Sequence, residues 1–228
     1  FILGYRNAYG ETPPSPTGAD GFDIGKNGTY LVYRKLEQDT ATFWRHMLEH
    51  ARPEVTDSDA AMNREAIRLA ARLVGRWPSG APIVKYPDFD PGSFAATDTF
   101  GFADDPRGLK CPLGAHIRRA NPRDMFAPSP EESLASVARH RILRRGRSYG
   151  PPSSGTPQKR AEPDGARRGL VFIALNTSFR RQFEFVQQTW LNNPKFAGLY
   201  DERDPLVSTI DDANRAYTIP GEPARRRL

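Results

Sequence analysis

The sequence predicts an α+β fold in which helices cover one face of a sheet. Two segments carry this prediction, because in each a short run of β-branched and aromatic residues is followed by an amphipathic helix. The chain has 228 residues, 38% of them hydrophobic, which is enough for one sizeable core. Between the two segments lies a long stretch rich in proline and glycine, where we expect irregular loops around a functional site.

The first unit follows a segment with the composition of a linker. Residues 1–27 are rich in glycine, proline, asparagine and aspartate, which favours turns. The run "TYLVYRKL" predicts a strand, and "DTATFWRHMLEHA" predicts a helix with Asp39 or Thr40 as its N-cap. A second helix is expected over "AAMNREAIRLAARLVG", where Gly75 supplies the stop.

The second unit lies near the other end of the chain. Residues 76–130 show little periodicity, "SLASVARHRIL" predicts a short helix, and "GPPSSGTPQKRAEPDGARRG" has the composition of a disordered loop. The run "LVFIALN" predicts a buried strand. A helix is expected over "SFRRQFEFVQQTWLNN", with the following side chains on one face: Phe179, Phe183, Val186 and Trp190.

Charge and composition leave two classes of partner open. The net charge of +6 is compatible with nucleic-acid binding, for which "RHRILRRGR" would contact phosphates, and equally with arginines that neutralise an anionic cofactor. The longest apolar run, "GLVFIAL", is far shorter than the roughly 18 residues of a membrane span, so we expect no membrane partner. Cys111 is the single cysteine, which excludes an intramolecular disulfide scaffold.

Three of the four histidines have an ordinary interpretation. His46 and His50 stand four residues apart on the first predicted helix, a spacing that presents two imidazoles to one metal ion. The residues between them do not follow the H-E-x-x-H order, so a solvated polar face is the favoured interpretation. His140 lies between two arginines, which favours a surface position.

His116 stands in a different setting, "CPLGAHIRRANPRD". Small residues precede it and would let a flat ligand come close, although a lone histidine is more often structural than a ligand. Zinc needs several protein ligands, whereas a haem iron can be held by one imidazole. Neighbouring arginines, among them Arg118, Arg119 and Arg123, would then meet the haem propionates.

Seven ordered blocks of the sequence resemble the dye-decolourising peroxidases. The resemblance covers nearly the whole chain, and "CPLGAHIRRANPRD" is its most specific element. The blocks are "FILGYRNAYGETPPSP", "NGTYLVYRKLEQDTATFW", "GRWPSGAP", "DDPRGLKCPLGAHIRRANPRD", "RHRILRRGRSYGPP", "RGLVFIALN" and "RRQFEFVQQTWLNNPKFAGLYDERDPL".

The resemblance implies a haem b cofactor and a role for particular residues. It makes His116 the axial ligand of the haem iron and Arg118 and Arg119 cofactor-binding residues. Arg144 matches the distal arginine of the family, with Arg145 as the alternative register. Glu184 is expected to be the carboxylate behind the axial histidine, or else to face water. Electron transfer from surface-bound substrates, or plain packing, is expected of three aromatic residues: Trp190, Tyr149 and Tyr200.

The same resemblance implies a domain organisation and a reaction. Residues 28–228 would be the second, ferredoxin-like domain of a two-domain peroxidase of the dimeric α/β-barrel type, truncated at its end, and residues 1–27 the linker from the first domain. The distal aspartate of the family's GxxDG motif would lie upstream, and "GADG" around Asp20 is interpreted as a turn. The whole protein would reduce hydrogen peroxide and oxidise a bulky aromatic compound through an oxoferryl intermediate, with the fragment weak or inactive. A homo-oligomer is possible, and a haem-binding protein without peroxidase activity is the alternative, ahead of a nucleic-acid-binding module.

Overall fold

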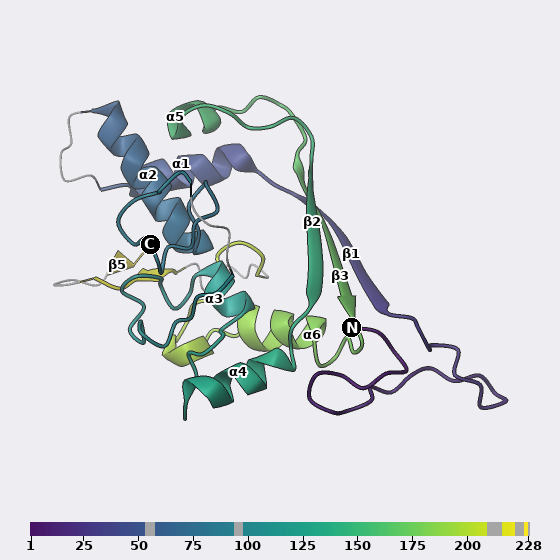
Figure 1. Cartoon of the computed structure of the whole chain (residues 1–228). Coiled ribbons are helices and arrows are strands. Elements are labelled where there is room, and N and C mark those ends of the chain that lie inside the picture. Colours follow the sequence, from purple (N-terminus) through teal and green to yellow (C-terminus); the bar gives the residue numbers. More distant parts are fainter. Residues whose placement is uncertain (53–57, 94–97, 209–215, 222–225, 228) are drawn as a thin grey trace.

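The computed structural model describes residues 1–52, 58–93, 98–208, 216–221 and 226–227 (Figure 1). The strands are β1 (Tyr30–Glu37), β2 (Leu143–Tyr149), β3 (Gly169–Asn176), β4 (Thr218–Ile219) and β5 (Arg226–Arg227). The helices are α1 (Thr40–His50), α2 (Asp59–Val74), α3 (His116–Ala120), α4 (Pro130–Ala138), α5 (Pro157–Arg160) and α6 (Phe183–Phe185), continued by the π-helix η1 (Val186–Leu191), and the 3-10 turn η2 (Phe196–Gly198). No helix in the described part of the chain is long and apolar enough to cross a membrane.

An antiparallel sheet of β1, β3 and β2, in that order, forms one side of the molecule. In the central strand, Ala174 is fully buried and pairs with Val32 on one side and Arg144 on the other. Phe172 on the same face contacts Phe183 of α6, with ring centroids 6.1 Å apart. The helices lie on this side of the sheet (Figure 1), which confirms the expected α+β layering.

The opposite face of the sheet is exposed and combines apolar side chains with charged ones such as Lys35, Arg145 and Arg147. Because side chains alternate along a strand, the residues of odd number point away from the helices. One cross-strand row consists of Leu31, Leu175 and Leu143, and Tyr33 pairs with Ile173 in the next row. Leu31 and Tyr33 keep 55% and 59% of their surface exposed. The sheet is therefore covered on one face alone within the described residues.

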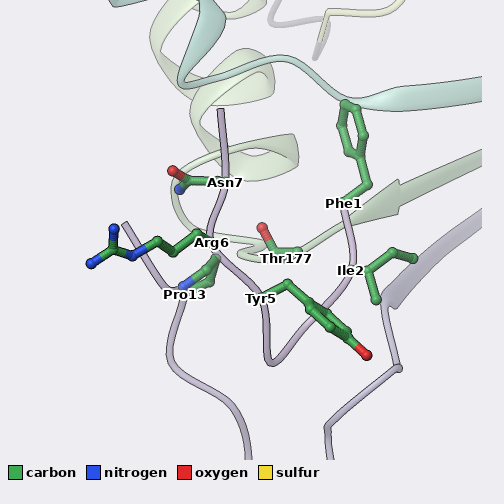
Figure 2. Close-up of a pocket in the computed structure, with 7 residues that line it drawn as sticks. All are labelled: Phe1, Ile2, Tyr5, Arg6, Asn7, Pro13 and Thr177. Atoms are coloured by element: carbon green, nitrogen blue, oxygen red, sulfur yellow. The ribbon is translucent and has the colours of Figure 1, made fainter. Parts of the chain in front are cut away.

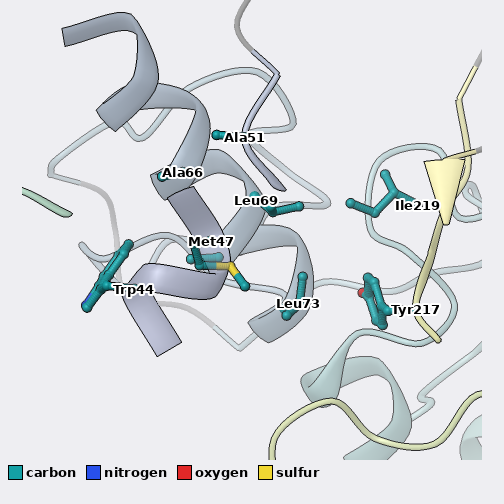
Figure 3. Close-up of a cluster of buried hydrophobic side chains, with 9 residues drawn as sticks. Trp44, Met47, Ala51, Ala66, Leu69, Leu73, Tyr217 and Ile219 are labelled. Atoms are coloured by element: carbon teal, nitrogen blue, oxygen red, sulfur yellow. The ribbon is translucent and has the colours of Figure 1, made fainter. Parts of the chain in front are cut away.

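Helices α1 and α2 pack together around a hydrophobic cluster (Figure 3). The Asp39 side chain accepts a hydrogen bond from the backbone N–H of Thr42, so Asp39 is the N-cap of α1. Trp44 and Met47 are buried on the inner face of α1, as the spacing predicts. The cluster also contains Tyr217 and Ile219, which brings the C-terminal strand β4 against the two helices.

The structure corrects three local expectations. The segment 150–169 includes helix α5, which packs against α1, where a disordered loop was expected. The arginine-rich segment "LRRGRSY" is strand β2, where no strand was expected. The expected helix over 178–193 is reduced to the short α6 and the π-helix η1.

The N-terminal segment packs against the end of the sheet. Leu3 is buried, and its backbone exchanges hydrogen bonds with Asn27 and Gly28. A hollow lies between this segment and Thr177, just after β3 (Figure 2), and is lined by Phe1, Ile2, Tyr5, Arg6, Asn7, Pro13 and Thr177. None of these lining residues is a site residue expected from the sequence.

Gly75 joins α2 to the segment that carries α3, and we predict that it tolerates no side chain. It adopts φ +91°, and a Cβ atom there would lie 2.3 Å from the Ile117 side chain. Gly75→Ala should therefore lower the free energy of unfolding by at least about 2 kcal/mol, from left-handed strain and from steric overlap. Urea unfolding measures this.

The matched control is Gly165→Ala. Gly165 also has a positive φ, of +69°, but a Cβ atom there would meet nothing within 4 Å. We expect a loss of about 1 kcal/mol, from backbone strain alone. Equal losses in the two variants would contradict the close approach of Gly75 to Ile117.

Candidate functional site

His116 is the first residue of helix α3 and is paired with a carboxylate. Its Nδ1–H donates a hydrogen bond of 2.8 Å to Oδ2 of Asp204, 88 residues further along the chain. The Asp204 side chain is completely buried, whereas the His116 side chain keeps 29% of its surface exposed. Because Nδ1 carries the proton in this contact, the lone pair of Nε2 is left for a ligand.

Asp204 is fixed in place by its own backbone surroundings. Its other carboxylate oxygen, Oδ1, accepts hydrogen bonds of 2.9 Å from the backbone N–H groups of Leu206 and Val207. Its own N–H donates to the carbonyl of Leu191, at the end of η1. Burial by itself raises the pKa of Asp204, but the hydrogen bond and charge of His116 and the two N–H groups outweigh it, so the pKa lies below its ordinary value. The carboxylate is therefore held ionised behind His116.

The carboxylate partner of His116 is thus Asp204. Glu184 was expected to lie behind His116 or else to face water, and the first of these alternatives is wrong. Glu184 lies in α6 with its side chain exposed. Asp204 belongs to "DERDPL", in which three acidic residues precede a proline. This composition was the one feature of the sequence that pointed to Asp204. Nothing in local periodicity links that cluster to His116, because the contact is long-range.

Arg119 does not face a cofactor surface, contrary to expectation. It is completely buried, and its guanidinium donates to the carbonyls of Trp190, Asn193 and Glu202. The Trp190 carbonyl lies in the last turn of η1, where carbonyls lack helical partners, and the Asn193 and Glu202 carbonyls lie in the segment beyond it. Burial lowers the pKa of Arg119 to about 10, with Asp204 and Glu202 opposing the shift. The side chain fastens the segment that carries Asp204 to α3.

Arg118 is also a buried, internally paired residue, which corrects its expected cofactor role. Its guanidinium lies 3.0 Å from the carboxylate of Asp105 and donates to the carbonyls of Cys111 and Asp105 at 2.7 Å. The same carboxylate accepts from the backbone N–H of Cys111. This network ties the irregular segment 105–111 to α3. Cys111 itself is fully buried, and burial raises the pKa of its thiol to about 12.

The two candidate distal arginines point to opposite faces of the sheet. Arg144 pairs with Ala174, so it lies on the face that packs against α6, the side on which α3 also lies (Figure 1). Arg145 pairs with Ile173 and points to the opposite, exposed face. Both side chains are exposed. Of the two registers, the sheet geometry therefore favours Arg144 as the residue directed toward the His116 side.

The three aromatic residues expected either to transfer electrons or to pack differ in exposure. Trp190 is buried beside Phe185, with ring centroids 5.3 Å apart, and the Tyr149 hydroxyl donates to the carbonyl of Leu36. Tyr200 is 80% exposed. Asp20 accepts a hydrogen bond from the N–H of Phe22, which agrees with its interpretation as part of a turn.

Comparison with known proteins relates this geometry to a group of enzymes. No protein-family model matches the chain. The multifunctional dye peroxidase DyP2 of Amycolatopsis sp. is 36% identical over 83% of this chain and 40% of its own length. The dye-decolorizing peroxidase msp1 of Mycetinis scorodonius is 31% identical over 87% of this chain and 38% of its own length.

The solved structures that resemble this chain also include DyP-type peroxidases. The DyP-type peroxidase of Anabaena sp. superposes with a TM-score of 0.68 at 28% identity, over 88% of this chain and 40% of that one. The DyP2 structure from Amycolatopsis sp. superposes with a TM-score of 0.65 at 32% identity, over 88% of this chain and 42% of that one.

The structure is therefore an α+β fold in which the carboxylate of Asp204 orients the imidazole of His116. The chain spans about 40% of the length of the curated relatives it matches. Over that region it belongs to the dye-decolorizing peroxidases.

The depressed pKa of Asp204 predicts a loss of stability in acid. The folded-state pKa lies below the ordinary value of 3.8, so the contribution is fully present above that value and is lost as pH falls through the folded pKa. Asp204→Asn should lower the free energy of unfolding by about 2 kcal/mol near neutral pH. This difference from the native chain should stay constant down to about pH 5 and narrow in stronger acid.

Urea unfolding at several pH values tests this prediction. Glu184→Gln is the control, because a change at an exposed side chain should cost less than about 0.5 kcal/mol at neutral pH. A difference for Asp204→Asn that grows as the pH falls below 4 would contradict the sign of the shift.

Proposed function

We propose that this chain is the haem-binding part of a dye-decolorizing peroxidase, with haem b as its cofactor. The observation that carries the proposal is the 2.8 Å hydrogen bond from His116 to the buried Asp204, which orients Nε2 as a free ligand atom. The similarity to named peroxidases over most of the chain supports it.

The residues present suit a haem iron better than a structural zinc ion. The His116 imidazole has a carboxylate as second partner, and such a partner makes a ligating histidine more basic and fixes its orientation. The pair provides one outward-facing nitrogen, which satisfies a haem axial position but not the four-ligand set of a structural zinc site. When bound, the haem would supply the redox chemistry that splits hydrogen peroxide.

The protein would contribute positioning and charge to this reaction. Asp204 would hold the Nδ1 proton of His116 and so increase the electron density at Nε2. Arg144, on the helix side of the sheet, would stabilise negative charge on a bound peroxide. A bulky aromatic compound would be the electron donor, and Tyr200 is an exposed ring at which it could be oxidised.

A proton acceptor for peroxide is not among the side chains that share the face of Arg144. Those of the described strands on this face are Tyr30, Val32, Arg34, Leu36, Gly146, Ser148, Leu170, Phe172, Ala174 and Asn176, and none is a carboxylate. The family resemblance implies that the acceptor is the aspartate of a GxxDG motif upstream, and the chain spans about 40% of its relatives' length, so we infer that the acceptor belongs to a part of the protein outside this chain. In this proposal residues 28–228 form the haem-binding domain, and residues 1–27 connect it to the rest.

Haem titration tests the proposal. His116→Gln should weaken haem binding at least tenfold and change the absorption spectrum, because the axial ligand is gone. Asp204→Asn should weaken it about 10- to 100-fold, because the amide N–H₂ facing Nδ1 favours the tautomer whose proton sits on Nε2. Absorbance titration with haem b measures both.

Glu184→Gln is the matched control and should bind haem as the native chain does. Native haem binding in His116→Gln would overturn the assignment of the ligand. Native binding in Asp204→Asn, together with a loss in Glu184→Gln, would show that the wrong carboxylate was assigned.

We predict weak or absent peroxide turnover by the haem-loaded chain alone, because Arg144 cannot accept a proton. Peroxide-dependent oxidation of a phenolic dye measures this turnover. Asp20→Asn should leave any residual rate unchanged. Robust turnover that depends on Asp20 would contradict the placement of the proton acceptor outside this chain. Haem binding without turnover would also agree with the second candidate, a haem protein of the same fold that is not a peroxidase.

A further inference from the structure

Helix α1 carries a second group of side chains with metal-ligand chemistry. The ligand atoms of His46, Glu49 and His50 all lie within 4.8 Å of one another. We propose that these three side chains bind a divalent transition-metal ion, Zn²⁺ above all, on the outer surface of α1. This site is separate from His116 and does not depend on the proposed peroxidase function.

The helix places the three side chains on one face. Residues three and four positions apart lie side by side on a helix surface, which brings Glu49 and His50 next to His46. The imidazole rings of the two histidines are 4.2 Å apart between centroids. On the inner face, Trp44 and Met47 are buried in the hydrophobic cluster that packs α1 against α2. This packing therefore holds in place the helix backbone that carries the three side chains.

One ligand is already oriented by a second partner. The Nδ1–H of His50 donates a hydrogen bond of 2.9 Å to the backbone carbonyl of His46. A carbonyl accepts only, so the proton of the neutral ring is on Nδ1 and Nε2 is free. In metal-bound histidine, the ring N–H that does not face the metal commonly donates to a backbone carbonyl.

The carboxylate of Glu49 is available as the third ligand. In the part of the chain that the structure describes, no hydrogen bond or ion pair engages that carboxylate. The neighbouring Arg52 donates instead to the backbone carbonyls of Glu49 and Ala51. Arg45 on the same helix reaches the carbonyl of Ala161.

Two imidazoles and one carboxylate form a donor set that suits zinc. The same set, completed by water in the fourth position, occurs in catalytic zinc sites. Tetrahedral zinc with bonds of about 2.1 Å requires ligand atoms roughly 3.4 Å apart. The exposed side chains of His46 and Glu49 can close from 4.8 Å by changes of rotamer, while His50 keeps its hydrogen bond to the carbonyl of His46. Cu²⁺ and Ni²⁺ should bind as well, whereas Mg²⁺ and Ca²⁺ prefer all-oxygen sites.

Isothermal titration of the metal-free full chain with Zn²⁺ tests the proposal. We expect one zinc ion per chain at this site, and an affinity at least tenfold lower in His46→Gln and in His50→Gln. Glu49→Gln should lose several-fold. Zinc should also raise the Tm of the native chain but not that of the double variant His46→Gln/His50→Gln.

Two controls separate this site from other sources of zinc binding. Glu131→Gln removes an exposed carboxylate from α4 and should leave the affinity unchanged. His116→Gln removes the other oriented imidazole and should also leave it unchanged. The proposal is overturned if the histidine variants on α1 bind zinc as the native chain does, if binding disappears in His116→Gln, or if the native chain binds no zinc at millimolar concentration.

Discussion

The proposed site depends on the hydrogen bond between His116 and Asp204. It joins residues 88 positions apart, one on a five-residue helix and one on an irregular segment. Neither element is long enough to be stable by itself. The contact therefore depends on whatever fixes α3 and the segment around Asp204 relative to each other, and on the exclusion of water from the carboxylate.

Two buried arginines provide that fixation. Arg119 binds carbonyls of the last turn of η1 and of the segment beyond it, which leads to Asp204, while Arg118 binds the segment 105–111 through Asp105. Both lie in the same short helix as His116. An irregular segment can be buried where donors such as these satisfy its backbone carbonyls. The cationic run after His116 therefore shapes the site from behind.

The elements with local signals were predictable, and those that depend on distant contacts were not. Strand β1, helices α1 and α2 and the stop at Gly75 follow from alternation, periodicity and capping. Strand β2 was missed because Arg144, Arg145 and Arg147 hide its pattern, and it becomes a strand by pairing with β3. Arg118 was assigned to a cofactor because it follows His116 in a cationic run that suits haem propionates. Its burial and its pairing with Asp105, 13 residues away, could not be inferred from spacing. Asp204 was missed as well, because its contact with His116 spans 88 residues and no local pattern indicates it.

The most direct test of the central claim is the resonance Raman spectrum of the ferrous, haem-loaded protein. The iron–imidazole stretching band reports which imidazole binds iron and how strongly its distal nitrogen is hydrogen-bonded. The account predicts a band that shifts on iron-isotope substitution, disappears in His116→Gln and moves to lower frequency in Asp204→Asn. A band that persists unchanged in His116→Gln would contradict the assignment of His116 as the ligand.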